Sequence, residues 1–217
     1  MKKIKYVVAG LLMMGLSVPA MAQNANYNAM LKPIEQSLKA TPNMDAKTLK
    51  NLIKDYQKEF KKEPKALVAL GEALLMNKQY DEATNIANDV LAKNKNYGDA
   101  YILLGDVAAM KDDGGNAAMW YEQSMTMDPK NPQGYMRYAN VYRKRSPEES
   151  ERALNMLKQN CPDFPIDAEA GNNFYLAGNY EKAYEYFAKT DKANLAEFYL
   201  VGYAVSAYMS NHKESAL

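Results

Sequence analysis

Cysteine and histidine are nearly absent from this chain, which has one of each among 217 residues, Cys161 and His212. A single thiol cannot form an intrachain disulfide or a cysteine-rich metal site. Nucleophilic catalysis of the Ser/His/Asp or Cys/His type needs a histidine beside its nucleophile, and His212 falls in a predicted turn without metal ligands at suitable spacing. The sequence therefore predicts no enzyme activity, no catalytic residues, no metal site and no cofactor.

Glycine and proline are also scarce, at 11 and 9 residues, and most of them separate periodic segments. Hydrophobic residues make up 47% of the chain and charged residues 24%, which is not the composition of a disordered protein. No segment has the pattern of a strand, so the composition favours an all-helical fold. A formal net charge of +1 gives no reason to expect nucleic acid or an anionic membrane as the partner.

Long hydrophobic runs are missing as well, and the apolar run at residues 6–16 is too short for a bilayer, which needs about 20 residues. Three lysines precede this run, and an Ala-x-Ala motif at residues 20–22 follows it. This order predicts a signal peptide over residues 1–22, cleaved between Ala22 and Gln23, and hence a periplasmic or secreted protein without stable membrane insertion. A retained anchor is the alternative. The residue directly after the cleavage site is Gln23 and not a cysteine, so lipid attachment there is excluded.

Residues 98–131 contain two amphipathic segments on either side of a turn. Apolar and small residues recur at the i, i+3, i+4, i+7 spacing of a helix with one buried face. They are Tyr101, Leu104, Gly105 and Ala108 in the first segment, and Ala117, Trp120, Tyr121, Ser124 and Met125 in the second. The intervening residues 112–116, Asp-Asp-Gly-Gly-Asn, lack the alternating oxygen ligands and distal glutamate of a calcium loop, so we interpret them as a turn.

The same pattern occurs one period earlier. Gly71 precedes Gly105 by 34 positions, and Ala83 precedes Ala117 by the same interval. Glycine inside a helix costs roughly 0.5–1 kcal/mol relative to alanine. A fixed register of small residues therefore predicts that the two helices of each hairpin approach closely at these positions.

These motifs resemble the tetratricopeptide repeat. The resemblance rests on Leu-Gly at 70–71 and 104–105, Tyr-Asp-Glu-Ala at 80–83, and Ala-x-x-x-Tyr at 117–121 followed by Asp-Pro at 128–129. It implies an all-α fold, a right-handed α-solenoid of antiparallel helix pairs. We expect a helical hairpin at residues 23–62, followed by an array at 63–217 of about four repeats and a truncated fifth.

The later repeats depart from the regular period. A third unit starts at Pro132, and its turn at residues 145–150 is two residues longer than expected. A fourth carries Gly-Asn-Tyr-Glu-Lys-Ala at 178–183, and a fifth starts near Glu197 with Ala216 at its small-residue position. Because a solenoid normally ends in a polar capping helix, we expect the natural protein to continue past Leu217.

The resemblance also implies a concave groove lined by the first helix of each repeat. The positions that it assigns to this groove are Glu72, Met76, Asp106, Met110, Asn140, Arg143, Lys144 and Tyr175. The leading hypothesis is a non-enzymatic, exported scaffold that holds a protein or peptide partner there. A glycan-binding accessory protein and the N-terminal adaptor region of a longer enzyme or receptor are the alternatives. The groove positions could also be ordinary solvated residues that hold no ligand. The sequence leaves open whether the groove or the convex face binds.

Overall fold

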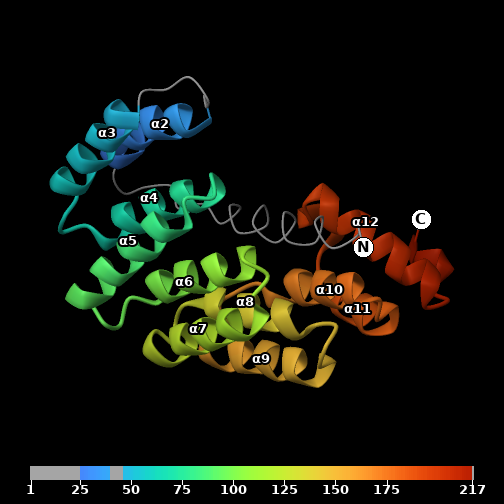
Figure 1. Ribbon diagram of the computed structural model, residues 1–217. Helices are drawn as coiled ribbons and strands as arrows, with labels where there is room; N and C mark the ends of the chain where they lie inside the picture. The colour runs from blue at the N-terminus through green and yellow to red at the C-terminus, as the bar shows by residue number, and fades with distance from the viewer. Residues whose placement is uncertain (1–24, 40–45, 217) are drawn as a thin grey trace. The chain divides into compact units, whose positions relative to one another are not determined.

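The structure, a computed structural model, describes residues 25–39 and 46–216 (Figure 1). Within these ranges the secondary structure consists of eleven α-helices and two short 3₁₀ helices, without any strand. The all-α prediction is confirmed. No helix of the described ranges is long and apolar enough to cross a membrane. The predicted signal peptide and its cleavage site lie outside these ranges.

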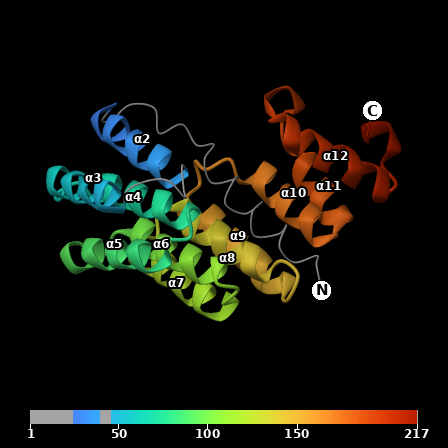
Figure 2. The same ribbon diagram turned by 45° about the horizontal axis from the view of Figure 1, so that its top comes forward.

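The chain divides into two compact units, with the boundary between Asp128 and Pro129. Each unit consists of antiparallel helix pairs, which are recognisable in both views of the ribbon (Figures 1 and 2). Unit 1 contains the pairs α2 (Ala25–Lys39) with α3 (Ala46–Glu59), α4 (Pro64–Met76) with α5 (Tyr80–Lys93), and α6 (Gly98–Met110) with α7 (Gly114–Met127). Unit 2 contains α8 (Pro132–Tyr142) with α9 (Pro147–Asn160), α10 (Ile166–Ala177) with α11 (Tyr180–Phe187), then η2 (Lys192–Asn194), α12 (Glu197–Met209) and η3 (Lys213–Ala216).

The core of unit 1 is built from the small and apolar positions that recur in each repeat. Ala83 and Ala117 are fully buried at the start of the second helices, and Leu70, Leu74 and Leu103 are buried on the first helices. The helix pair α2–α3 buries its own apolar side chains in the same cluster. They include Leu31, Ile34, Leu38, Tyr56 and Phe60. One continuous cluster therefore runs from α2 to α6.

The turn inside each regular hairpin has the same backbone geometry. Lys78, Asp112, Gly178 and Asn211 each have a positive φ, between 60° and 83°. Around Asp112, the amide of Asp113 donates to the carbonyl of Ala108 (3.0 Å), and the amide of Asp112 donates to that of Ala109 (3.1 Å). These two bonds define a Schellman motif, which satisfies the last carbonyls of a helix. Asp113 then caps α7, because its Oδ1 accepts from the amide of Asn116 (3.1 Å).

The predicted close approach within a hairpin is most evident at Gly105. A Cβ atom at this position would lie 2.3 Å from Cε1 of Tyr121, so the ring of Tyr121 packs directly on the backbone of α6. Gly171 has the same relation to Phe187, whose Cδ1 would lie 2.7 Å from an added Cβ. In both hairpins the ring belongs to the residue four positions after the small residue that starts the second helix, Ala117 or Ala183. A small residue at the start of the second helix and a ring four positions later therefore recur as a pair in both hairpins, with the ring packed on a glycine of the first helix.

Unit 2 ends in a helix with one buried side. Tyr199 and Tyr203 of α12 are buried, and their rings pack near Phe187, with centroids 6.4 and 5.9 Å from its own. The opposite side of α12 is exposed and apolar, with Phe198, Leu200, Val201, Tyr208 and Met209. Tyr199 and Tyr203 therefore belong to the core of unit 2.

Candidate functional site

The first helices of neighbouring hairpins lie side by side within each unit. In unit 1 α4 contacts α6, and in unit 2 α8 contacts α10. All eight residues that the sequence assigns to a groove are on these four helices or directly after them. Glu72, Met76, Asp106 and Met110 belong to unit 1, whereas Asn140, Arg143, Lys144 and Tyr175 belong to unit 2. We therefore describe the first-helix face of each unit separately.

The first-helix face of unit 1 presents Glu72 and Met76, which are one turn apart on α4. Both are exposed, and Met76 leaves 53% of its surface accessible. Met110, in the last turn of α6, is half-buried. Burial raises the pKa of Tyr97, and the negative charges of Asp99 and Glu72 raise it further. This end of the face is acidic and apolar.

Asp106 occupies a different environment from its neighbours in the predicted set. It exposes only 7% of its surface, and its Oδ1 accepts a 2.7 Å hydrogen bond from the hydroxyl of Tyr121 on α7. The absence of a side chain at Gly105 lets the Tyr121 ring reach this carboxylate. Asp106 thus contributes to the hydrogen bonding between the two helices of its own hairpin.

The first-helix face of unit 2 contains a connected polar network. Oδ1 of Asn140 on α8 accepts from Nδ2 of Asn173 on α10 (2.9 Å) and from Nη1 of Arg143 (3.3 Å). Oδ1 of Asn173 accepts in turn from Oγ of Ser150 on α9 (3.0 Å). Ser150 and Asn173 are buried, Asn140 is half-buried, and Arg143 exposes only 7% of its surface. Burial lowers the pKa of the Arg143 guanidinium.

The other two predicted residues of unit 2 differ in their surroundings. Lys144 follows Arg143 and is exposed, as is Arg145. Tyr175 of α10 is half-buried; its ring centroid lies 6.3 Å from that of Tyr180, and a Cβ at Gly202 would lie 3.3 Å from its Cδ1. Tyr175 therefore packs on its neighbours while part of its ring stays accessible.

Sequence reasoning did not identify Asn173 and Ser150 as members of this network. Asn173 follows Asn140 by 33 positions, almost one repeat length, and this interval was an available signal. Ser150 gave no signal, because the sequence assigned it to a turn at residues 145–150, whereas the structure places it within α9.

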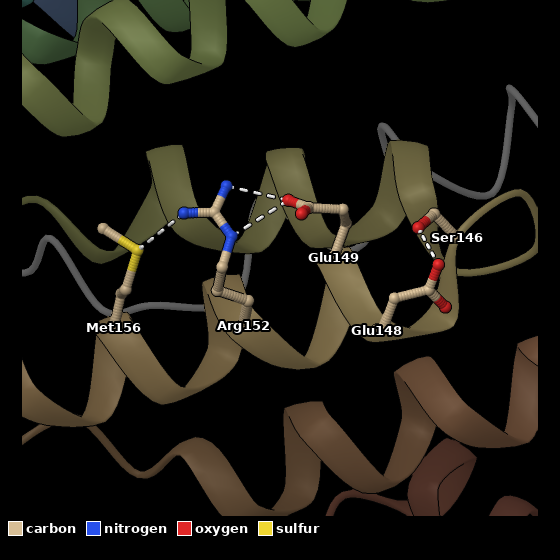
Figure 3. Close-up of polar contacts among 5 residues, drawn as sticks. All are labelled: Ser146, Glu148, Glu149, Arg152 and Met156. Atoms are coloured by element: carbon tan, nitrogen blue, oxygen red, sulfur yellow. Dashed lines mark hydrogen bonds and ion pairs between the residues drawn. The ribbon is translucent and has the colours of Figure 1, made fainter.

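The three glutamates near the start of α9 have local partners. At the start of α9, Oε2 of Glu149 accepts from Nε and Nη2 of Arg152, at 3.0 and 2.7 Å (Figure 3). The side chain of Glu148 accepts from the hydroxyl of Ser146, and this bond lowers the pKa of Glu148 (Figure 3). Glu151 forms an ion pair with Lys182 of α11.

A hollow of about 290 Å³ in unit 1 lies away from the predicted residues. Its walls are Lys61, Lys62, Pro64, Leu67, Val90, Lys93 and Asn94. None of the eight predicted groove residues lines it. Within the described ranges, no three acidic, cysteine or histidine side chains are grouped closely enough to hold a metal ion.

No family model and no curated protein matches this chain. Solved structures do match. PilW, a type IV pilus biogenesis factor, aligns with 89% of this chain and 90% of its own, at a TM-score of 0.61 and 16% identity. TTC0263, a TPR protein of Thermus thermophilus, aligns with 82% of this chain and 99% of its own, at a TM-score of 0.57 and 17% identity. Pseudomonas aeruginosa PilF aligns with 94% of this chain and 98% of its own, at a TM-score of 0.54 and 14% identity. The chain therefore has the tetratricopeptide-repeat fold, as the repeat motifs implied.

Proposed function

We propose that this tetratricopeptide-repeat protein is a non-enzymatic scaffold that holds a protein or peptide partner on the first-helix faces of its repeats. The observation that carries the proposal is the packing of first helices side by side, α4 on α6 and α8 on α10. It places residues about one repeat apart on a shared surface, as the 2.9 Å bond between Asn140 and Asn173 illustrates. An extended or helical segment that crosses several repeats would meet such a surface continuously.

The chemistry of the exposed positions suits a peptide ligand. Met76 supplies a flexible apolar side chain that adapts to irregular partners, and Glu72 lies one turn before it. In unit 2, Asn140, Lys144 and Tyr175 supply hydrogen-bond donors and an aromatic edge. Aromatic and polar side chains of this kind are typical of interaction surfaces.

Site-specific photo-crosslinking in the source organism tests the proposal. A benzophenone amino acid at Met76 on the first-helix face should form a covalent adduct with a partner protein. The matched control is Met119 on the second helix α7, which is also an exposed methionine, at 42% accessibility. If position 119 forms adducts and position 76 does not, the partner binds the second helices and the proposal is wrong. A glycan array run in parallel tests the alternative, since specific binding to a glycan would indicate a carbohydrate ligand in place of a protein partner.

We also propose that the mature protein is exported, on the basis of the lysines, apolar run and Ala-x-Ala motif of residues 1–22. Amino-terminal sequencing of the protein recovered from the periplasmic or secreted fraction should begin at Gln23. A protein recovered in the cytosol with its first residues intact would contradict export.

A further inference from the structure

Positive charge in this chain is concentrated around helix α3. Residues 46–65 contain seven lysines and three acidic residues, whereas residues 66–217 contain 15 lysines and arginines and 21 acidic residues. The small net charge of the whole chain therefore conceals two regions of opposite sign. A positive region on an otherwise negative protein attracts anionic partners even where the net charge does not.

Four of these lysines form a stripe along α3. They follow one another at intervals of three, four and four residues, as Lys47, Lys50, Lys54 and Lys58. At about 100° per residue these positions fall within an arc of about 80°, over about 17 Å of helix. All four side chains are exposed. We call this surface the lysine stripe.

The opposite side of α3 is fixed in the core of unit 1. Tyr56 is fully buried, and its hydroxyl donates a 3.0 Å hydrogen bond to the carbonyl of Ala66 in the first turn of α4. Leu52 and Ile53 pack against the same core. Both views show α3 at one end of unit 1, beside α2 (Figures 1 and 2). These contacts fix the rotation of α3 about its axis, so the lysine stripe faces outward.

No negative charge of α3 interrupts the stripe. Its acidic residues, Asp55 and Glu59, fall about 60° and 100° outside the arc of the lysines. Among the described residues, Lys50, Lys54 and Lys58 form no ion pair. Like charges four positions apart destabilise a helix. A row of lysines that repel one another and have no internal partner favours an external anion.

Further lysines continue the positive charge past the end of α3. Lys61 and Lys62 line the hollow of about 290 Å³ together with Lys93 of α5. Lys61 follows Lys58 by only three residues, so the field of this group adds to that of the stripe. Two hairpins of unit 1 therefore contribute to one positive region.

The composition of the stripe indicates the kind of anion. Lysine carries a compact, strongly hydrated charge on a flexible stem, whereas arginine supplies the fixed fork that recognises a single carboxylate or phosphate. α3 contains no arginine, and its one aromatic side chain, Tyr56, is buried. The stripe thus lacks the groups for directional recognition or for stacking on nucleic-acid bases. A straight row of lysines on an amphipathic helix suits a flat surface with many phosphates, such as an anionic bilayer.

We propose that the lysine stripe of α3 adsorbs this protein to a bilayer surface that contains anionic phospholipids. The lysines interact with the lipid phosphates, while the apolar side of α3 stays in the core and does not insert. The inference goes beyond the proposed function and does not rest on it. α3 is the second helix of its hairpin, whereas the partner of the proposed function binds first helices.

Vesicle flotation measures the adsorption. The probes are vesicles of phosphatidylcholine alone and of a two-to-one mixture with phosphatidylglycerol. The full chain is tested beside the chain that begins at Gln23, because the lysines and apolar run of residues 1–22 are themselves a membrane-binding sequence. The chain from Gln23 should float with the anionic vesicles only, and rising salt should release it. Equal recovery with both vesicle types, or binding that requires residues 1–22, would overturn the proposal.

Matched lysine variants assign the surface. Replacing Lys50, Lys54 and Lys58 together by glutamine should weaken binding about a hundredfold, because each lysine near an anionic surface contributes about a fivefold factor. The control makes the same charge change at three exposed lysines outside α3, and it should retain most of the affinity. These control positions are Lys78, Lys95 and Lys158. Equal losses in the two triple variants would show that net charge, and not the stripe, determines binding.

A charge swap within α3 tests the geometry at constant composition. Lys54→Asp combined with Asp55→Lys keeps the net charge but places a carboxylate inside the stripe. Binding to the anionic vesicles should fall about tenfold or more. Unchanged affinity would exclude the stripe as the contact surface.

Thermal unfolding and footprinting separate binding from folding. Glutamine and lysine have similar helix propensities, so the triple variant of α3 should keep the unfolding midpoint of the wild type. If it does not fold, acetylation of the wild-type lysines still gives an answer. Anionic vesicles should protect Lys50, Lys54 and Lys58 from acetylation, as read by mass spectrometry, but not Lys158. Equal modification with and without vesicles would overturn the proposal.

Soluble polyglutamate separates a bilayer from an acidic protein segment. Binding of polyglutamate without binding of the anionic vesicles would assign the stripe to an acidic protein and overturn the proposal. The crosslinking test of the proposed function is independent of both probes. A partner captured at Met76, together with no flotation, would contradict only the adsorption, and flotation without a captured partner would contradict only the proposed function.

Discussion

The ring of Tyr121 occupies the space that a side chain at Gly105 would fill, since an added Cβ would lie 2.3 Å from its Cε1. Real Cβ atoms do not approach a ring carbon so closely, so either the ring or the helix would have to move. Gly105→Ala should therefore destabilise the protein by about 1–3 kcal/mol, the usual cost of overpacking. Equilibrium unfolding in urea measures the loss.

Gly115 provides the control for this substitution. A Cβ at Gly115 would meet nothing closer than Oδ1 of Asp113, at 3.7 Å. Gly115→Ala should be neutral or stabilising by about 0.5 kcal/mol, since alanine restricts the unfolded chain. If both variants lose the same stability, the close approach at Gly105 is not the cause.

The hydroxyl of Tyr121 should contribute separately from its ring. Tyr121→Phe keeps the packing on Gly105 but removes the 2.7 Å hydrogen bond to the buried carboxylate of Asp106. We expect a loss of about 1–3 kcal/mol, because a charged acceptor loses a donor in a buried position. In a double-mutant cycle with Asp106→Ala, which removes the acceptor, the coupling energy should exceed about 0.5 kcal/mol. A coupling near zero would show that the bond contributes nothing to stability.

The repeated hairpin turn predicts stabilising substitutions. Lys78 and Asp112 adopt a positive φ, 63° and 60°, and a side chain is costly in this conformation. Replacement of either residue by glycine, which Gly178 already supplies in the same turn of unit 2, should raise stability by about 0.5–1 kcal/mol. Lys93→Gly, in the last turn of α5, is the control and should lower it by a similar amount. Differential scanning calorimetry measures both the expected gain in the turn variants and the expected loss in the control.

Glu169 should make stability fall as pH rises, opposite to the usual carboxylate. Burial raises the pKa of Glu169 above its ordinary value of 4.5, although Tyr199 and Arg137 partly oppose this shift. The folded protein therefore holds this proton at a pH where the unfolded chain has released it, and stability declines from about pH 4.5 upward through the raised pKa. Glu169→Gln cannot ionise. The difference between the unfolding midpoints of the wild type and the variant should therefore decrease as the pH rises above about 4.5. A constant difference would contradict the shift.

Helices and turns were predictable from the sequence because their causes are local. The i, i+3, i+4, i+7 spacing at residues 98–131 predicted α6 and α7, and the Asp-Gly cluster at 112–116 predicted the turn between them. The register of Gly105 and Ala117 indicated a close approach inside the hairpin. The tetratricopeptide-repeat fold follows from the repetition of these local patterns, since each hairpin buries its apolar face on the next.

The candidate site was predictable only as a set of positions. The register assigned Glu72, Met76 and Lys144 to a groove, and in the structure all three are exposed, on first helices or shortly after them. That they contact a partner stays a prediction. The register could not indicate that Asp106 and Arg143 are buried, because burial depends on what the neighbouring helices pack around a side chain. Tyr121 reaches Asp106 from the second helix of the hairpin, 15 positions later.

The sequence by itself determined the helices, the turns and the period of this protein. Only the tertiary structure decided which polar residues face solvent and which bond to one another. Asn140 meets Asn173 because successive first helices pack side by side, and Ser150 joins them from the lengthened third hairpin. Local spacing sets the direction of a side chain from its helix. The burial of Arg143 depends instead on what neighbouring repeats place around it, which no single period contains.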